Sequence, residues 1–162
     1  MFLEFHLDYG PVHRNRLPNT YQRPIFWHDI PFWIAAGENL TRTAVFVSPL
    51  LMPLHIGRSR HSLGLTVYTF GLLVYLLAWM MQIWYPKTQW SAGRAGFMAP
   101  AYTPLVWLAG IGLTGDSLYA GGVYRSWMYL ALSAVFLGFH NAHAWIVYSR
   151  HHARFIDPQA AH

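Results

Sequence analysis

The sequence contains no cysteine and few charged residues. Without cysteine the chain has no disulfide, no thiolate metal ligand and no cysteine nucleophile. Charged residues make up 10% of the 162 residues, whereas soluble domains typically carry about a quarter. Acidic residues are the scarcest, with six Asp and Glu against eleven Lys and Arg. Because the basic residues are scattered and not clustered, this composition argues against a nucleic-acid-binding domain, and it also disfavours a disordered chain or a soluble enzyme.

The sequence also lacks the motifs of common enzyme classes. No serine stands in a nucleophile elbow, and there is neither a phosphate-binding loop nor a zincin motif. With six acidic residues in the whole chain, a hydrolase or phosphotransferase would have few groups to work with. These absences favour a role other than catalysis, although they leave an enzyme of another kind open.

Hydrophobic residues make up 54% of the chain and gather in long runs. Residues 63–85, 95–114 and 126–149 are each long enough to cross a bilayer core about 30 Å thick, which takes about 20 helical residues. Lipid cannot hydrogen-bond an open backbone, and the alternating pattern of a barrel is absent, so we expect these segments to be α-helices. Pro100 and Pro104 predict a kinked start for the second of them.

A fourth stretch, residues 31–54, is as long but less apolar. Asp29 can cap its start, and Glu38, Asn39 and Arg42 lie near its middle. A charge at the centre of a spanning helix costs about 2.5 to 3.5 kcal/mol, so the alternative is an amphipathic helix in the headgroup region. Because Glu38 and Arg42 can pair along one face, we expect a spanning helix. The predicted fold is an all-α integral membrane bundle of four transmembrane helices.

The distribution of basic residues predicts the orientation of this bundle. With four spans, one side of the membrane holds Arg14, Arg16, Arg23, Lys87, Arg94, Arg150 and Arg154. The other side holds Arg58, Arg60 and Arg125. The richer side is cytoplasmic by the positive-inside rule, so we expect both termini in the cytoplasm, at a bacterial inner or photosynthetic membrane. Residues 1–30 then form an N-terminal cytoplasmic or interfacial arm, and residues 150–162 form a short basic tail.

Glu38, Asn39 and Arg42 form the first candidate site. Around the helix axis Arg42 lies about 40° and Asn39 about 100° from Glu38, so the three polar groups share one side. Ionisable groups inside a membrane often mark an ion path, a proton relay or a substrate site. The interpretation that we favour is a self-paired clasp that fixes the register of the helix or holds the N-terminal arm.

His140 and His143 form the second candidate site, on the last predicted helix. They lie about 60° apart around the helix axis and can therefore address one ligand together. Neutral imidazole ligates haem iron or chlorophyll magnesium, so His140 and His143 are candidate cofactor ligands. A hydrogen-bonded structural role is the interpretation that we favour for them. A di-iron centre is disfavoured because the other predicted spans contain no histidine, and we predict no separate metal centre.

Ala134, Gly138 and Ala142, here called the small-residue seam, repeat at the four-residue spacing that lets membrane helices approach closely. Both histidines of the same helix point away from the seam, at about 140° and 200° from Gly138. Either the seam packs inside the bundle and the histidines face a cofactor or partner, or the seam faces a partner and the histidines lie inside. In both arrangements we expect one face of the last helix to meet another molecule.

The sequence contains no recognisable set of catalytic residues, and four short helices leave much of their surface available for contact with other proteins. Both features favour a role as a subunit. We expect an accessory or scaffolding subunit of a larger photosynthetic or respiratory membrane complex, with integral membrane partner subunits and no nucleic acid. Its last helix would contact a chlorophyll-type pigment, a carotenoid, a quinone or haem, for which the aromatic surface is suited. The alternative is a small autonomous membrane enzyme or transporter that uses the site of Glu38 and Arg42.

Overall fold

The computed structural model describes residues 21–53, 59–115, 117–119 and 124–156, with side chains as far as residue 153. All regular structure within these residues is helical, which confirms the all-α prediction. The elements are α1 (Arg23–Phe26), α2 (Phe32–Val47), the 3-10 helix η2 (Ser48–Leu51), α3 (Ser59–Trp84), α4 (Gln89–Ala92), α5 (Arg94–Tyr102), α6 (Pro104–Thr114) and α7 (Ser126–Ile156).

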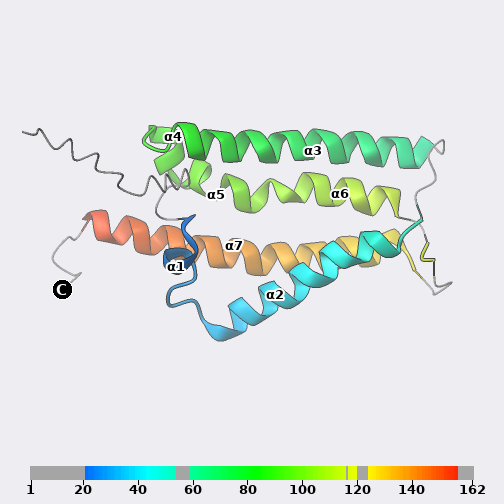
Figure 1. The fold of residues 1–162 in the computed structure, drawn as a ribbon, viewed down its shortest axis with the longest axis horizontal. Coiled ribbons are helices and arrows are strands. Elements are labelled where there is room, and N and C mark those ends of the chain that lie inside the picture. The colour runs from blue at the N-terminus through cyan, green and yellow to red at the C-terminus, as the bar shows by residue number, and fades with distance from the viewer. Residues whose placement is uncertain (1–20, 54–58, 116, 120–123, 157–162) are drawn as a thin grey trace, which may run out of the picture.

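The long helices lie side by side in one bundle. Helices α5 and α6 follow one another between α3 and α7, and α2 crosses α7 obliquely on its outer side (Figure 1). The chain runs along the bundle in alternating directions, so that α1 and the carboxyl end of α7 lie at the same end (Figure 1). The core that joins the helices consists of Val45, Met52, Trp107, Leu108, Tyr129, Phe136 and Leu137.

Three helical segments are long and apolar enough to cross a membrane, and they coincide with three of the predicted spans. They are Ser59–Trp84, Arg94–Thr114 and Ser126–Ala153. The last helix is longer than predicted, because α7 continues to Ile156. The predicted basic tail, residues 150–162, is therefore helical in its first part.

Helix α2 is not among these segments, so the predicted count of four spanning helices is not confirmed. Its 16 residues reach about 24 Å at about 1.5 Å per residue, short of a bilayer core of about 30 Å. The prediction that Asp29 caps this helix is wrong. Pro31 occupies the N-cap position without a side-chain hydrogen bond, and Asp29 adopts a φ of 51° and pairs with His28 at 2.7 Å.

Glycines bring α3 and α6 into close contact. A β-carbon on Gly71 would collide with the backbone of Trp107, and one on Gly110 would collide with the backbone of Tyr68. The small-residue seam of α7 behaves differently, since nothing lies within 4 Å of a β-carbon placed on Gly138. Of the two arrangements left open for the seam, packing inside the bundle is therefore not the one that Gly138 adopts. Small residues do allow close helix packing here, but between α3 and α6.

A side chain of α3 accommodates a proline inside α5. Pro100 has no N–H, so the carbonyl of Gly96 lacks its partner within the helix. The buried side chain of Gln82 donates from Nε2 to that carbonyl over 2.7 Å. The helix then breaks at Thr103, before Pro104 begins α6. The predicted irregularity is present, but the break lies near the middle of the Arg94–Thr114 span and not at its start.

Residues 21–29, here called the N-terminal segment, pack against the bundle. The hydroxyl of Tyr21 donates to the carbonyl of Phe97 in α5 over 2.9 Å. Arg150 of α7 donates to the carbonyl of His28. The described part of the predicted interfacial arm is thus tied to α5 and α7, and residues 1–20 of that arm lie outside the described residues.

Candidate functional site

The centre of the candidate site is the carboxylate of Glu38. The buried residues of α2 are Ile34, Glu38 and Val45, which share the face that packs against α7. The Glu38 side chain therefore sits on the apolar face of its helix, and none of it is exposed. Because a buried carboxylate is costly unless it is paired and hydrogen-bonded, its partners decide what the site can do.

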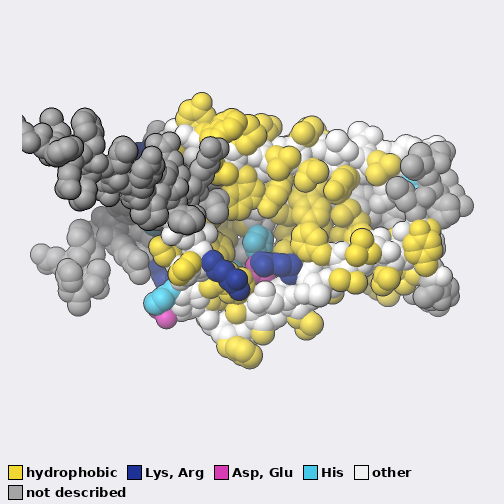
Figure 2. Space-filling model, in the orientation of Figure 1, with side chains coloured by type: hydrophobic (Ala, Val, Ile, Leu, Met, Phe, Trp, Pro, Cys, Tyr) yellow, Lys and Arg dark blue, Asp and Glu magenta, His cyan; other side chains and the backbone are white. Residues whose placement is uncertain are grey.

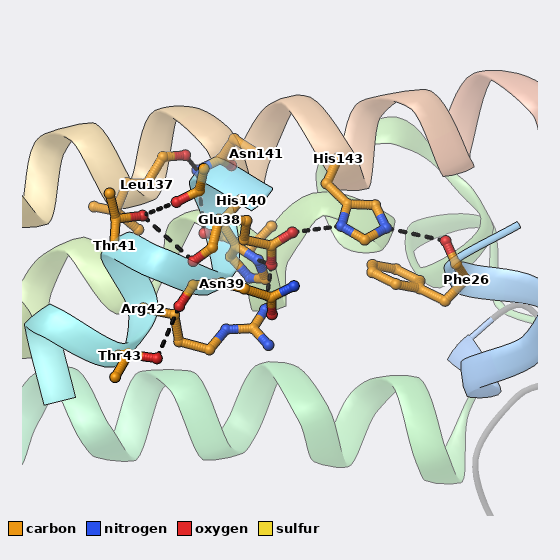
Figure 3. A network of polar contacts seen from close by, with 12 residues as sticks. Phe26, Glu38, Asn39, Thr41, Arg42, Thr43, Leu137, His140, Asn141 and His143 are labelled. Atoms are coloured by element: carbon orange, nitrogen blue, oxygen red, sulfur yellow. Dashed lines mark hydrogen bonds and ion pairs between the residues drawn. The ribbon is translucent and has the colours of Figure 1, made fainter. Parts of the chain in front are cut away.

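Three side chains contact the carboxylate of Glu38 (Figure 3). Arg42, one turn further along α2, donates from Nη2 to Oε1. Nδ1 of His140 lies 2.8 Å from the same oxygen, and Nδ1 of His143 lies 2.5 Å from Oε2. The structure thus joins residues of the two predicted sites into one group, which we call the Glu38 cluster: Glu38, Arg42, His140 and His143.

His143 is held at both of its ring nitrogens. While Nδ1 contacts Glu38, Nε2 lies 3.0 Å from the backbone carbonyl of Phe26 in α1. The imidazole is fully buried, with the ring of Phe26 at 4.5 Å and that of Trp27 at 4.6 Å between centroids. The N-terminal segment therefore forms one wall of the site.

These contacts fix how many protons Glu38 and His143 hold together. The Phe26 carbonyl can only accept, so Nε2 of His143 carries a hydrogen. The contact between Nδ1 and Oε2 then needs a second hydrogen, either on Nδ1 as imidazolium or on Oε2 as carboxylic acid. In both forms the pair holds one proton more than a carboxylate and a neutral imidazole. The geometry is that of the protonated pair.

Arg42 connects the cluster to the surface. Its side chain is 37% exposed, while that of Glu38 is completely covered. The guanidinium also lies over the ring of Trp27, with 5.9 Å between its central carbon and the ring centroid. Figure 2 shows basic, acidic and imidazole side chains close together on this face, with apolar side chains on either side. The site is a charged group set into an apolar surface.

His140 occupies a different environment from that of His143. Its ring stacks on that of Phe136, with 5.4 Å between the centroids and 13° between the planes, and its side chain is 20% exposed. It also lines a cavity walled by aromatic side chains. With Nδ1 turned to Glu38, Nε2 is the nitrogen of His140 that remains for another molecule.

Asn39 was predicted to share the site, and the structure places it elsewhere. Its side chain is exposed, and its backbone carbonyl accepts a hydrogen bond from Thr43 over 2.9 Å. Packing against α7 selects the face of α2 that carries Glu38, and a residue about 100° away around the helix turns off that face. The assignment of Asn39 to the polar site is therefore wrong.

The cluster does not have the arrangement of a metal centre. Among the described residues, no group of three or more histidine, aspartate or glutamate side chains is placed to hold a metal ion. The two Nδ1 atoms approach different oxygens of one carboxylate instead of a common point. His143 has an acceptor at each nitrogen, so of the two predicted cofactor ligands only His140 keeps a nitrogen for coordination.

Sequence reasoning treated the polar residues of α2 and the histidines of α7 as separate sites, and it missed the Phe26 carbonyl and Trp27. A signal for the first connection was present. Glu38 is the one acidic residue well inside the predicted spans, and a buried carboxylate needs donors. His140 and His143 were the strongest donors on the facing helix. Nothing in the sequence marks a backbone carbonyl as a partner.

No family model matches this chain, and neither the curated proteins nor the solved structures contain a significantly similar one.

Proposed function

We propose that this protein is a multi-pass membrane protein that takes up and releases a proton at the Glu38 cluster. The observation that carries this proposal is the contact of one fully buried carboxylate with Arg42, His140 and His143. Ionisable groups buried among membrane helices are costly and often belong to proton relays and ion paths. Arg42, on the same helix, is enough to neutralise the charge of Glu38. The two histidines of α7 add side chains that exchange protons near neutral pH.

Membrane insertion is supported by the three long apolar helices. We place α2 beside them as a short fourth helix, because its polar side chains are largely satisfied within the protein. The hydroxyl of Thr41 donates to the carbonyl of Gly37 over 2.6 Å, and that of Ser48 donates to Ala44 over 2.5 Å. Such bonds to the preceding turn reduce the cost of hydroxyls in lipid. The excess of basic residues at the two ends favours the cytoplasmic side for both.

Proton release would change the contacts of the N-terminal segment. A carboxylate on Glu38 needs a hydrogen on Nδ1 of His143, and the remaining neutral imidazole then has a bare Nε2. A bare Nε2 facing the carbonyl of Phe26 sets two acceptors against each other. If the hydrogen stays on Nε2 instead, the contact with Glu38 is lost. Loss of the proton therefore loosens either α1 or α2 from α7. The contacts of His140 and Arg42 with Oε1 favour a carboxylate on Glu38, and so affect which of the two contacts of His143 is lost.

Nitrogen-15 magnetic resonance of histidine-labelled full-length protein in detergent tests this proposal. At neutral pH we expect the signals of His143 to report hydrogen on both nitrogens or a proton shared with Glu38. Raising the pH should remove that state in a single-proton step. In Glu38→Gln the amide cannot share the proton, so His143 should be a neutral imidazole at neutral pH.

The matched control is Asn39→Gln, an exposed neighbour on the same helix, which should leave the histidine signals unchanged. A His143 signal with one bare nitrogen at every pH in the wild-type protein would contradict the proposal. So would signals identical in wild type and Glu38→Gln.

A second function, that of an accessory subunit in a larger photosynthetic or respiratory membrane complex, is favoured by the outward position of the small-residue seam. Gly138 and Ala134 are exposed, and the space beside Gly138 is open. Such a surface suits the close approach of a helix from another subunit. If this holds, Gly138→Leu should weaken co-migration with large complexes on native gels, while Leu77→Ala on the exposed side of α3 should not.

A further inference from the structure

A cavity next to the Glu38 cluster has the properties of a binding site for a small aromatic molecule. It has a volume of about 150 Å³ and lies between the N-terminal segment, α3, α5 and α7. We propose that it binds one uncharged aromatic ring that carries a hydroxyl group, with the hydroxyl donating to Nε2 of His140. This inference deepens the proposed function, because it rests on the charge state of the Glu38 cluster.

The volume of the cavity matches a single ring. An apolar cavity of about 150 Å³ is large enough to hold benzene. Typical sites for drug-sized ligands measure about 300–1,000 Å³, and a tetrapyrrole is larger than one benzene ring several times over. The cavity therefore does not suit the haem or chlorophyll-type pigment that the sequence suggested for the last helix. A phenol, or the ring of a hydroquinone head group, matches it in size.

The walls of the cavity favour an aromatic guest. Its aromatic lining consists of Tyr21, Phe26, Tyr75, Trp79 and Phe97. Tyr21 stacks on Phe97 at 5.0 Å with 19° between the planes, and Trp79 meets Tyr21 edge-on at 5.3 Å. Rings that are fixed against one another offer a preformed surface, and aromatic pairs are stabilised beyond the effect of the area they bury.

The lining also selects an uncharged guest. Among the described residues, none of the side chains that line the cavity is a lysine, arginine, aspartate or glutamate. The hydroxyl of Tyr21 is already committed to the carbonyl of Phe97, and burial raises the pKa of Tyr21, so it remains a neutral phenol. A charged ring would enter without a counter-ion, which is strongly unfavourable in an apolar site.

The charges of the cluster decide whether His140 donates or accepts. Oε1 of Glu38 accepts from Arg42, so Nδ1 of His140 carries the hydrogen in its own contact with that oxygen. If His140 were also protonated on Nε2, the cluster would hold Arg42, His140 and the proton of His143 against one carboxylate. Such a surplus of positive charge is unfavourable in a buried group. With its hydrogen on Nδ1, His140 presents Nε2 as an acceptor, so its partner must be a donor such as a hydroxyl.

Binding of phenol and toluene to the detergent-solubilised full chain tests the inference. The two probes have similar size, and only phenol can donate a hydrogen bond. We expect phenol to shift the nitrogen-15 signal of His140 Nε2 in a saturable way, whereas toluene should leave that signal in place. The comparison needs no variant, so it holds even if the substitutions below disturb folding.

Filling the cavity should abolish the phenol effect. Ala144 lines the cavity and is buried, so Ala144→Leu should weaken phenol binding at least tenfold. Ala131→Leu is the matched control, since it adds the same side chain to an exposed position of the same helix outside the lining and should bind phenol like wild type. A phenol shift that persists in Ala144→Leu would show partition into detergent and overturn the inference.

Equal effects of phenol and toluene on His140 would also overturn it, because the hydroxyl would then have no acceptor in the cavity. The result is distinguishable from a failure of the proposed function. That function is read at His143 without any added molecule, whereas the binding site is read at His140 in the presence of phenol.

Discussion

The two main helix interfaces of this protein are built in opposite ways. Between α3 and α6, Gly71 and Gly110 bring the backbones into contact, and the fit depends on shape. Between α2 and α7, a carboxylate and two imidazoles meet in a buried group, and under the proposed function the fit depends on a proton. A close-packed apolar interface has one arrangement, whereas an interface that contains a shared proton has at least two.

The difference assigns separate roles to the two sides of the bundle. Helices α3 and α6, with α5 joined to α3 through Gln82, form what we call the fixed side. Under the proposed function, the α2–α7 interface is the side that can change, and the N-terminal segment contacts it through Phe26 and His143. The cavity beside His140 lies between the two sides, with walls from α3 and α5 as well as from α7. A molecule bound there would touch the fixed side and the proton-dependent interface at once.

Removing the central carboxylate should have the largest effect on this comparison. Glu38→Ala leaves Arg42 and the histidines without their acceptor in a buried site, which typically costs about 3–5 kcal/mol. We expect this loss in the free energy of unfolding of detergent-solubilised protein, measured by thermal or denaturant unfolding. Glu38→Gln, which keeps one acceptor oxygen, should lose less. If Glu38→Ala were as stable as wild type, the α2–α7 interface would not depend on the cluster.

The glycine interface should be almost as sensitive to a single methyl group. In Gly71→Ala the new β-carbon would meet the backbone of Trp107, which cannot move aside like a side chain, so we expect a cost of about 3 kcal/mol. Gly138→Ala provides the matched control on α7. Its β-carbon meets open space, and the better helix propensity of alanine should raise stability by up to about 1 kcal/mol. If Gly71→Ala and Gly138→Ala lost the same unfolding free energy, the α3–α6 interface would not depend on the close packing at Gly71.

The sequence predicted the apolar frame of the fold well, because long runs without charge permit few structures other than helices. The three long apolar helices and the break near Pro104 follow directly from local composition. The length of α2 was overestimated. Pro49 and the hydroxyl residues before it turn the end of that helix into a 3-10 turn, which hydropathy alone does not register.

The candidate site was harder to predict, because its contacts join distant parts of the chain. The pair of Glu38 and Arg42 lies within one helix, so helical spacing predicts it. The contacts of Glu38 with His140 and His143 depend on how α2 is rotated against α7, which no local pattern fixes. The same rotation explains why Asn39 is exposed and why the small-residue seam faces outward.

The fixed side of the bundle also contains a buried polar contact, and this contact involves no titrating group. It tests whether a neutral hydrogen bond stabilises that side. Gln82→Leu removes the donor to the Gly96 carbonyl, whose helical partner is already missing because of Pro100. We expect a loss of about 2 kcal/mol in unfolding free energy for this unsatisfied buried acceptor. Pro100→Ala restores an N–H in the helix, so Gln82→Leu should cost less in that background. Additive losses in the double variant would mean that Gln82 does not replace the missing helical bond.

The smallest effect is expected where the N-terminal segment meets the fixed side. Tyr21→Phe removes the hydrogen bond to the Phe97 carbonyl and keeps the ring, so we expect a loss of about 1 kcal/mol at neutral pH. Burial raises the pKa of Tyr21 above its ordinary value of 10.0, which means that the folded protein keeps a phenol proton that the unfolded chain releases. Stability should therefore fall as the pH rises past about 10, and the fall should be less steep in Tyr21→Phe.

Some of that fall should remain in the variant, because burial also raises the pKa of Tyr124 to about 12. The measurement is a series of unfolding curves for wild type and Tyr21→Phe across the alkaline range. If unfolding free energy fell equally with pH in both proteins, the Tyr21 hydroxyl would be in water, and the N-terminal segment would not be held to α5 by this bond. The fixed side would then be independent of this segment, leaving the proton-dependent contact of Phe26 with His143 as its main attachment near α1. A reduced slope would instead show that the segment is anchored on both sides, so that release of the proton frees only one of its two ends.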